Sequence, residues 1–294
     1  MDMDTAITVF DIGPTDFGAS QRHDLDQNGY FCVNGAFALS QCAAMAAAFD
    51  LIKQQEGARA GHEVSQEPGA VRVSNIFNKT DAFDCTLNCK PLLAAARYLL
   101  GDFKVHGANV REPERGAGQQ ILHSDVTRLP DGSWRVINAL ILLDDMTLKN
   151  GPTRVVPGSH NWPAINVPDE NLIEEATAAL MSGPDKTQEW AVEDKKTSDQ
   201  KVVVSGAGRD EITPENPFAP YPGEEFLTAP AGTVIVTNAH LWHSGTRNRS
   251  GARRRMLHLS YTPRGQPQHF DQRTNLTPAL YERMSAARRY LLDI

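Results

Sequence analysis

The chain has 294 residues, of which 29 are Lys or Arg and 36 are Asp or Glu, so its formal net charge is −7. This acidic balance disfavours a broad nucleic-acid-binding surface. No apolar run approaches the ~20 residues that a membrane-spanning helix needs. The N-terminus also lacks the basic and apolar regions of a signal peptide. We therefore expect a cytoplasmic protein that binds neither nucleic acid nor membranes.

The first third of the chain predicts helices and one short strand. A turn signal precedes residues 30–33, Tyr-Phe-Cys-Val, which predict a strand. Good helix formers with apolar residues at helical spacing predict a helix over residues 36–55, in which Ser40 could cap the strongest part. A second helix is predicted over residues 91–100, because Gly101 follows as a stop.

The pattern changes after residue 103 to short segments with strand composition, separated by Gly, Asn, Asp or Pro. The predicted strands cover residues 103–110, 134–143, 202–205, 232–237 and 255–262. A last helix is predicted over residues 278–292, with Thr277 as its N-cap. Helices followed by many strands indicate a mainly β sandwich or barrel with helices against one sheet.

Residues 183–225 interrupt this order with a polar, charged stretch that is rich in turn formers. Loops of this length in a compact domain are usually functional or disordered. We expect this insertion to act as a lid or an interface within a single domain spanning residues 1–294, with a plain solvated insertion as the alternative. A homodimer in which it covers a neighbour's site is a further hypothesis.

Three residues form a candidate metal site. His123 and Asp125 are two residues apart, so in an extended chain their side chains lie on one side, and His243 can come from a distant strand. Two imidazoles and one carboxylate are the ligand set of non-heme Fe(II) oxygenases. His240, three residues before His243, is the rival for the third position.

An ordered set of motifs surrounds these residues, and with it the chain resembles a known family. The set comprises Asn150-Gly151-Pro152, Pro157-Gly158-Ser159-His160, His243-Ser244-Gly245 with Asn248, and a trailing run of arginines. From about residue 29 to about residue 263, the chain resembles the phytanoyl-CoA dioxygenase-like Fe(II)/2-oxoglutarate oxygenases. The resemblance implies a double-stranded β-helix, which is a cupin-like jelly roll flanked by helices. It also implies that His123, Asp125 and His243 are the iron ligands, with His160 in a structural turn.

The resemblance further implies a binding site for 2-oxoglutarate. Counting from His243 places the family's carboxylate-binding arginine at Arg254, and a one-residue difference in the loop would move the role to Arg255. A guanidinium suits this role because it offers two parallel N–H donors. Gln120 and Thr153 match co-substrate contacts of some relatives, although strict alternation would place Gln120 on the other side of the strand from His123.

The expected reaction uses Fe(II), O₂ and 2-oxoglutarate, with ascorbate as a reductant, and releases succinate. The retained Asp125 disfavours halogenation, so hydroxylation is the default, with desaturation, epoxidation or rearrangement as variants. We expect a small specialised metabolite or amino-acid-like compound as substrate. The candidate residues for the substrate pocket are Arg72, Phe77, Asn138 and Trp242.

Two other classes of protein fit parts of the same pattern. One is a Zn²⁺-dependent isomerase or hydrolase on a cupin-like barrel, which needs a bound water but no arginine for an oxoacid. The other is a catalytically silent binding module. Tight binding of 2-oxoglutarate would argue against the first alternative, and metal in the purified protein would argue against the second.

Overall fold

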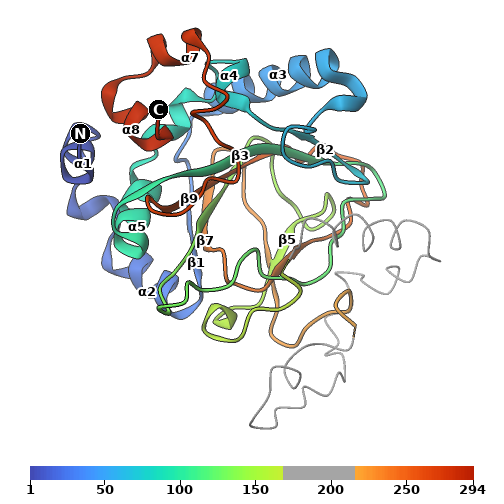
Figure 1. Cartoon of the computed structure of the whole chain (residues 1–294). Coiled ribbons are helices and arrows are strands. Elements are labelled where there is room, and N and C mark those ends of the chain that lie inside the picture. The colour runs from blue at the N-terminus through green and yellow to red at the C-terminus, as the bar shows by residue number, and fades with distance from the viewer. Residues whose placement is uncertain (168–215) are drawn as a thin grey trace.

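The computed structural model describes residues 1–167 and 216–294, and two antiparallel β-sheets form its centre (Figure 1). The large sheet has six strands in the order β1-β7-β4-β9-β3-β2. These strands are β1 (Tyr30–Val33), β2 (Ala70–Val73), β3 (Phe103–Pro113), β4 (Ile137–Leu142), β7 (Val234–Asn238) and β9 (Met256–Pro263). The small sheet has the order β6-β5-β8, with β5 (Thr153–Val155), β6 (Glu225–Leu227) and β8 (His243–Gly245).

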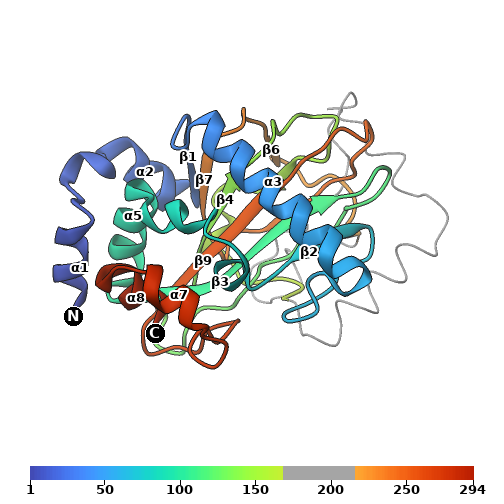
Figure 2. The same ribbon diagram turned by 90° about the horizontal axis from the view of Figure 1, so that it is seen from above.

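Helices cover the outer face of the large sheet (Figure 2). They are α1 (Met3–Val9), α2 (Ala19–Gln27), α3 (Leu39–Glu56), α4 (Ile76–Lys79), α5 (Lys90–Leu100), α7 (Pro278–Arg283) and α8 (Ala286–Leu292). Their buried apolar side chains join the outward residues of the strands in one core that contains both Met3 and Leu292. Among residues 1–167 and 216–294, none of the helices has the length and apolar character that crossing a bilayer requires.

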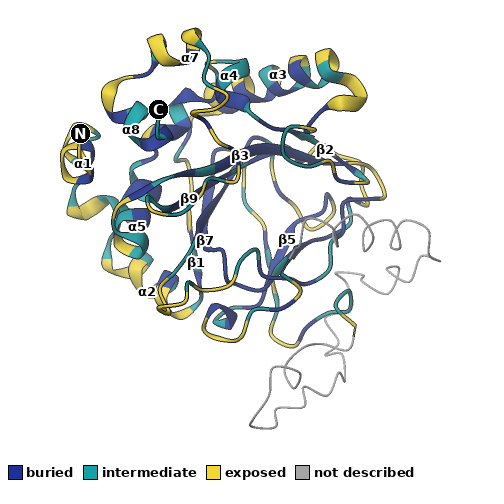
Figure 3. Cartoon of the chain, viewed as in Figure 1, coloured by how far each residue is buried: buried dark blue, intermediate teal, exposed yellow. Residues whose placement is uncertain are grey.

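The two faces of the large sheet differ in chemistry because side chains alternate along each strand. In β9, Leu257, Leu259 and Tyr261 belong to the core under the helices. His258 and Ser260 therefore point to the inner side, between the two sheets. Figure 3 shows how thoroughly the strands are buried while the helices keep an exposed side. Part of the inner side is thus lined by polar residues that are buried or half-buried.

A second apolar cluster closes one part of the space between the sheets. Leu140 and Ile235 of the large sheet pack there with Val155 and Leu227 of the small sheet. Burial of aliphatic side chains against each other stabilises the pairing of the two sheets. The remaining inner surface, next to β2, β3 and the middle of β9, carries the polar side chains.

The predicted mainly β architecture with flanking helices is confirmed. The predicted single C-terminal helix over residues 278–292 is wrong, because the helix ends at Arg283 and a second helix follows. Ser285 caps this second helix by accepting a hydrogen bond from the Arg288 N–H. Thr277 caps the first of the two helices, as predicted. Ser40 is not a cap, because α3 already begins at Leu39. The predicted strand over residues 202–205 and most of the 183–225 insertion lie outside the described residues.

Candidate metal centre

His123, Asp125 and His243 come together between the two sheets, with their ligand atoms within 4.8 Å of one another. Nε2 of His123 and Nε2 of His243 each lie 3.4 Å from Oδ1 of Asp125. The ring centroids of the two histidines are 4.4 Å apart. Two imidazole nitrogens and a carboxylate oxygen therefore converge on one point from one side.

Backbone pairing holds the two histidines in register. His123 and His243 form an antiparallel bridge in which each N–H donates to the carbonyl of the other at 2.9 Å. His243 begins β8, whereas His123 is an isolated bridge residue between bends at Leu122 and Asp125, outside the named strands. The N–H of Asp125 donates to the carbonyl of Ala239 at 3.0 Å. Segments more than 100 residues apart are thus fixed against each other at the site.

Hydrogen bonds orient all three candidate ligands. Nδ1 of His123 lies 2.8 Å from the carbonyl of Ile121, and Nδ1 of His243 lies 2.8 Å from the carbonyl of Leu241. Carbonyls only accept, so each Nδ1 carries the proton and each Nε2 keeps its lone pair for a metal. Oδ2 of Asp125 accepts a hydrogen bond of 2.6 Å from the Asn138 amide, which leaves Oδ1 facing the histidines.

The electrostatics of the group fit a cation. Burial alone would raise the pKa of Asp125, but the adjacent His243 and His123 outweigh it and hold the pKa well below its usual range. Burial would lower the pKa of His243, yet Asp125 raises it. The carboxylate thus stays ionised in a half-buried position, where it is ready to bind a cation. Nitrogen and oxygen donors of this kind fit Fe(II).

The rival histidine lies elsewhere. Nδ1 of His240 pairs with the carbonyl of His160 at 2.9 Å, and its ring lies beside Trp134. Within the described parts of the chain, His240 is not a member of the group that could hold a metal. His160 lies against the same Trp134 ring, which is consistent with the structural role expected for it.

The three consecutive arginines differ sharply in their partners. Arg253 pairs with Asp50 and Glu112, and Arg255 pairs with Asp144 at 2.6 Å. Arg254 is fully buried, and its Nη1 contacts Sδ of Met256 at 3.8 Å, while its Nε and Nη2 have no hydrogen-bond partner among the described residues. Burial lowers the pKa of Arg254 to about 9, and the positive charge of the nearby Arg111 contributes to the same shift.

The other two predicted co-substrate residues lie around β8. Oε1 of Gln120 accepts from the Gly245 N–H at 3.0 Å, and the Gln120 N–H donates to the Gly245 carbonyl at 2.9 Å. Thr153 is buried in β5, where it is paired with Gly245. Both residues therefore share a neighbour that is two positions from His243.

The four predicted pocket residues have different surroundings. Asn138 touches Asp125, and Arg72 projects from β2 to the inner side, because Val71 and Val73 pack on the outer core. Phe77 is buried in that outer core. Trp242 packs with Leu122 and Tyr221 in a separate cluster, and its Nε1 donates to the Pro163 carbonyl at 3.0 Å. These placements do not favour Phe77 or Trp242 as substrate contacts.

Two charged residues near the site were not predicted. Glu67 and Arg111 form a buried ion pair, with Nε to Oε2 at 2.7 Å and Nη2 to Oε1 at 2.5 Å. Arg111 directly follows the strand predicted over residues 103–110, and a signal for it would have required extending that strand to Pro113, where β3 ends. Glu67 lies in an irregular segment and has no such signal.

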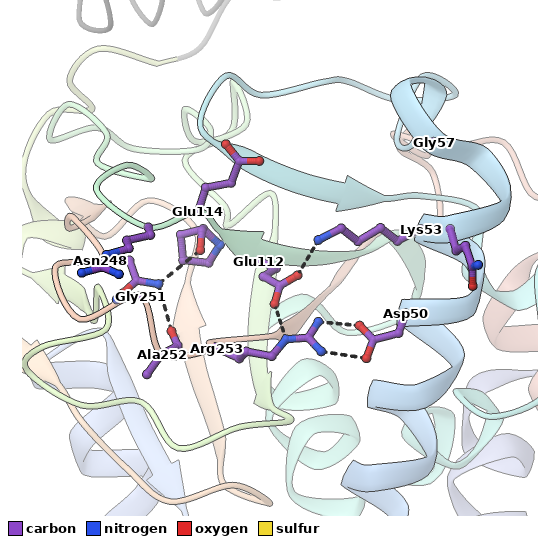
Figure 4. Close-up of a pocket in the computed structure, with 12 residues that line it drawn as sticks. Asp50, Lys53, Gly57, Glu112, Glu114, Asn248, Gly251, Ala252 and Arg253 are labelled. Atoms are coloured by element: carbon purple, nitrogen blue, oxygen red, sulfur yellow. Dashed lines mark hydrogen bonds and ion pairs between the residues drawn. The ribbon is translucent and has the colours of Figure 1, made fainter.

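A solvent-open hollow lies apart from this group of ligands (Figure 4). Its charged side chains pair with each other. Arg253 contacts both Asp50 and Glu112, and Lys53 lies 3.1 Å from Glu112. The hollow thus offers mostly side chains that already have partners, and it contains no member of the group that could hold a metal.

Comparison with known proteins gives a consistent assignment. The family model for phytanoyl-CoA dioxygenase (PhyH) matches residues 25–256. L-proline trans-4-hydroxylase of Streptomyces griseoviridis is 29% identical over 58% of this chain, and the match spans 59% of that enzyme. Ectoine dioxygenase of Stutzerimonas stutzeri (strain A1501) is 23% identical over 88% of this chain and 81% of its own length.

Solved structures agree with the chain in fold. HygX from Streptomyces hygroscopicus, solved with nickel and 2-oxoglutarate bound, has a TM-score of 0.57 at 14% identity, covering 86% of this chain and 89% of its own. EctD from S. alaskensis, with bound Fe, has a TM-score of 0.57 at 20% identity, covering 86% and 80%. The predicted jelly-roll fold is confirmed by these neighbours.

Proposed function

This chain belongs to the phytanoyl-CoA dioxygenase family, and we propose from that premise that it oxidises a small molecule with Fe(II), O₂ and 2-oxoglutarate. The observation that carries the proposal is the convergence of His123, Asp125 and His243, together with a buried arginine, Arg254, that has no anionic partner among the described residues. Fe(II) held by the three side chains would activate O₂ while 2-oxoglutarate is decarboxylated to succinate. The protein's part is to bind, orient and shield the reactants.

We assign the far carboxylate of 2-oxoglutarate to Arg254. A guanidinium sealed from water without a counter-ion is unfavourable, and a carboxylate would remove that penalty. Arg253 and Arg255 already have carboxylate partners, so neither is available in the same way. Because Arg254 has no solvent-accessible surface, Met256 and its neighbours have to shift when the co-substrate enters.

Gln120 and Thr153 are proposed as additional co-substrate contacts. The Gln120 carbonyl oxygen is engaged by Gly245, so its amide N–H₂ is the group that it offers. Thr153 offers a hydroxyl from the neighbouring strand. Both would also keep β8, and with it His243, in a fixed position relative to the bound co-substrate.

Hydroxylation is the proposed outcome for the substrate. Asp125 is present, ionised and held by Asn138, so the carboxylate position is not vacated for a halide. A Zn²⁺ hydrolase on the same fold would have no use for the unpaired Arg254. A lid or dimer-interface role for residues 183–225 and a single domain over residues 1–294 stay predictions.

Conversion of 2-oxoglutarate to succinate without added substrate tests the proposed function. The wild-type protein should form succinate slowly when Fe(II), ascorbate and O₂ are supplied. Asp125→Ala should reduce the rate at least about a hundredfold, because the metal loses an anionic ligand. His240→Ala is the matched control and should keep most of the rate. No Fe(II)-dependent succinate from the wild type, or equal rates for Asp125→Ala, would contradict the proposal.

A further inference from the structure

Four charged residues gather at the inner side of the large sheet near the candidate metal centre. They are Glu67, Arg72, Arg111 and Arg254. Arg72 and Arg111 are directly opposite each other in the β2–β3 pairing. Arg254 lies close enough to Arg111 and Glu67 for their charges to affect its pKa. Three guanidinium groups therefore share a single carboxylate.

The pairing within this group is unequal. Arg111 takes both oxygens of Glu67, with Nε to Oε2 at 2.7 Å and Nη2 to Oε1 at 2.5 Å, and also donates to the Gly118 carbonyl at 3.0 Å. Within residues 1–167 and 216–294, Arg72 is left with a contact of 3.9 Å to Oε2 of Glu67, and its buried Nε has no hydrogen-bond partner. Glu67 thus satisfies Arg111 and leaves the donors of Arg72 largely unused.

Arg72 differs from Arg254 in access and position. The side chain of Arg72 keeps 21% of its surface accessible, whereas Arg254 has none. Arg72 is opposite Arg111 in the β2–β3 pairing, and a Cβ added at Gly245, two residues after His243, would lie 3.5 Å from Nη1 of Arg111. Arg72 is therefore on the side of the sheet that carries the metal ligands, where the charge of Asp125 acts on it. Asn109, which is paired with His258 across β3 and β9, has a buried amide oxygen without a partner.

The charges around the site leave a surplus once the proposed reactants are bound. Arg72, Arg111 and Arg254 contribute +3, while Glu67 and Asp125 contribute −2. Fe(II) and the two carboxylates of 2-oxoglutarate cancel each other. We place the balance of +1 at Arg72, whose donors are largely unused, and a surplus charge at a partly buried side chain favours binding of an anion.

We propose that Arg72 binds a carboxylate of the substrate and thereby selects small carboxylic acids, with Asn109 as a neighbouring hydrogen-bond acceptor. This inference rests on the proposed function, because it assigns 2-oxoglutarate to Arg254. A guanidinium binds a carboxylate through two parallel hydrogen bonds, which fix the orientation of the substrate as well as its identity. The carbon to be oxidised is then set by its distance from that carboxylate.

Calorimetric titration of the full chain tests this, with Mn(II) and 2-oxoglutarate bound and O₂ excluded. The probes are L-proline, L-leucine and L-lactate, each paired with its carboxamide. At least one acid should bind roughly tenfold or more tightly than its amide, as expected for a charge-assisted pair. Arg72→Gln should abolish that preference and leave the Kd of 2-oxoglutarate within about threefold. Arg273→Gln, at a side chain that is 70% exposed, should change neither.

The titration separates this inference from the proposed function. If 2-oxoglutarate fails to bind the wild-type protein, the proposed function fails. If 2-oxoglutarate binds but no acid exceeds its amide, or if Arg72→Gln weakens 2-oxoglutarate as much as Arg254→Gln does, the assignment of Arg72 is wrong. Arg72→Lys keeps the charge beside Glu67 and should retain part of the preference, which covers the case in which Arg72→Gln does not fold.

Discussion

Arg254 is the residue whose surroundings are hardest to explain by stability alone. A buried guanidinium with two unpaired nitrogens costs free energy in the absence of an anion. Arg255 has the opposite character, because Asp144 accepts hydrogen bonds from its Nε at 2.8 Å and its Nη2 at 2.6 Å. We therefore propose separate tasks for these neighbouring arginines, co-substrate binding for Arg254 and a structural ion pair for Arg255.

This contrast predicts opposite effects of Arg254→Met and Arg255→Met. Without ligands, Arg254→Met should leave the free energy of unfolding unchanged or raise it, because an apolar side chain replaces an uncompensated charge. Arg255→Met should lower it by about 1–3 kcal/mol, because Asp144 loses its partner. Urea unfolding measures both.

Binding of 2-oxoglutarate with Mn(II) completes the test of these variants. It should raise the Tm of the wild type and of Arg255→Met but not of Arg254→Met. Retention of the ligand-induced shift in Arg254→Met, or its loss in Arg255→Met, would transfer the co-substrate role to Arg255.

The sequence could identify the residue types of the site but not most of their hydrogen-bond and ion-pair partners. The pair His123 and Asp125 predicted a metal group only weakly by its spacing, and the surrounding motifs with the family resemblance selected His243 over His240 as its third member. The choice between Arg254 and Arg255 depends on Asp144, and no local pattern relates a residue to a partner over 100 positions away. Glu67 could not be predicted for the same reason, because its ion pair with Arg111 forms only when β2 and β3 are paired.

At the scale of elements, the strands were more predictable than the connections. β1 begins and ends as predicted, and the cores of β3, β4, β7 and β9 were identified, because alternating or continuous apolar residues are a strong signal. The loop that carries His123 and Asp125 has no such signal. It is paired with β8 through the isolated bridge between His123 and His243. The break at Ser285 was also missed, since the flanking residues all favour helix.

Gly245 connects the element that carries His243 to the loop that carries Gln120. A Cβ at this position would lie 2.8 Å from the Gly118 carbonyl and 3.0 Å from Oε1 of Gln120. Gly245→Ala should therefore displace β8 and lower the metal affinity at least about tenfold, with a drop in Tm. Gly265→Ala is the matched control, because a Cβ there meets nothing within 4 Å.

Metal titration followed by thermal unfolding measures the effect of the two glycine variants. Equal metal affinity in Gly245→Ala and the wild type would mean that the position of His243 does not depend on this close approach.

At the scale of the whole molecule, the fold separates stability from chemistry. The outer face of the large sheet and its helices form the main apolar core, whereas the inner face carries the charged and polar residues. Fold class followed from the order of predicted elements. The strand order β1-β7-β4-β9-β3-β2 did not, because the pairing of strands far apart in the sequence depends on long-range packing.

The central claim is that His123, Asp125 and His243 together bind one metal ion. Equilibrium dialysis against Fe(II) under argon, followed by metal analysis, tests it most directly. We predict about one iron per chain for the wild type and for His240→Ala, and loss of at least about nine-tenths of it in His123→Ala, Asp125→Ala and His243→Ala. Full iron content in any of these three variants, or its loss in His240→Ala, would contradict the account.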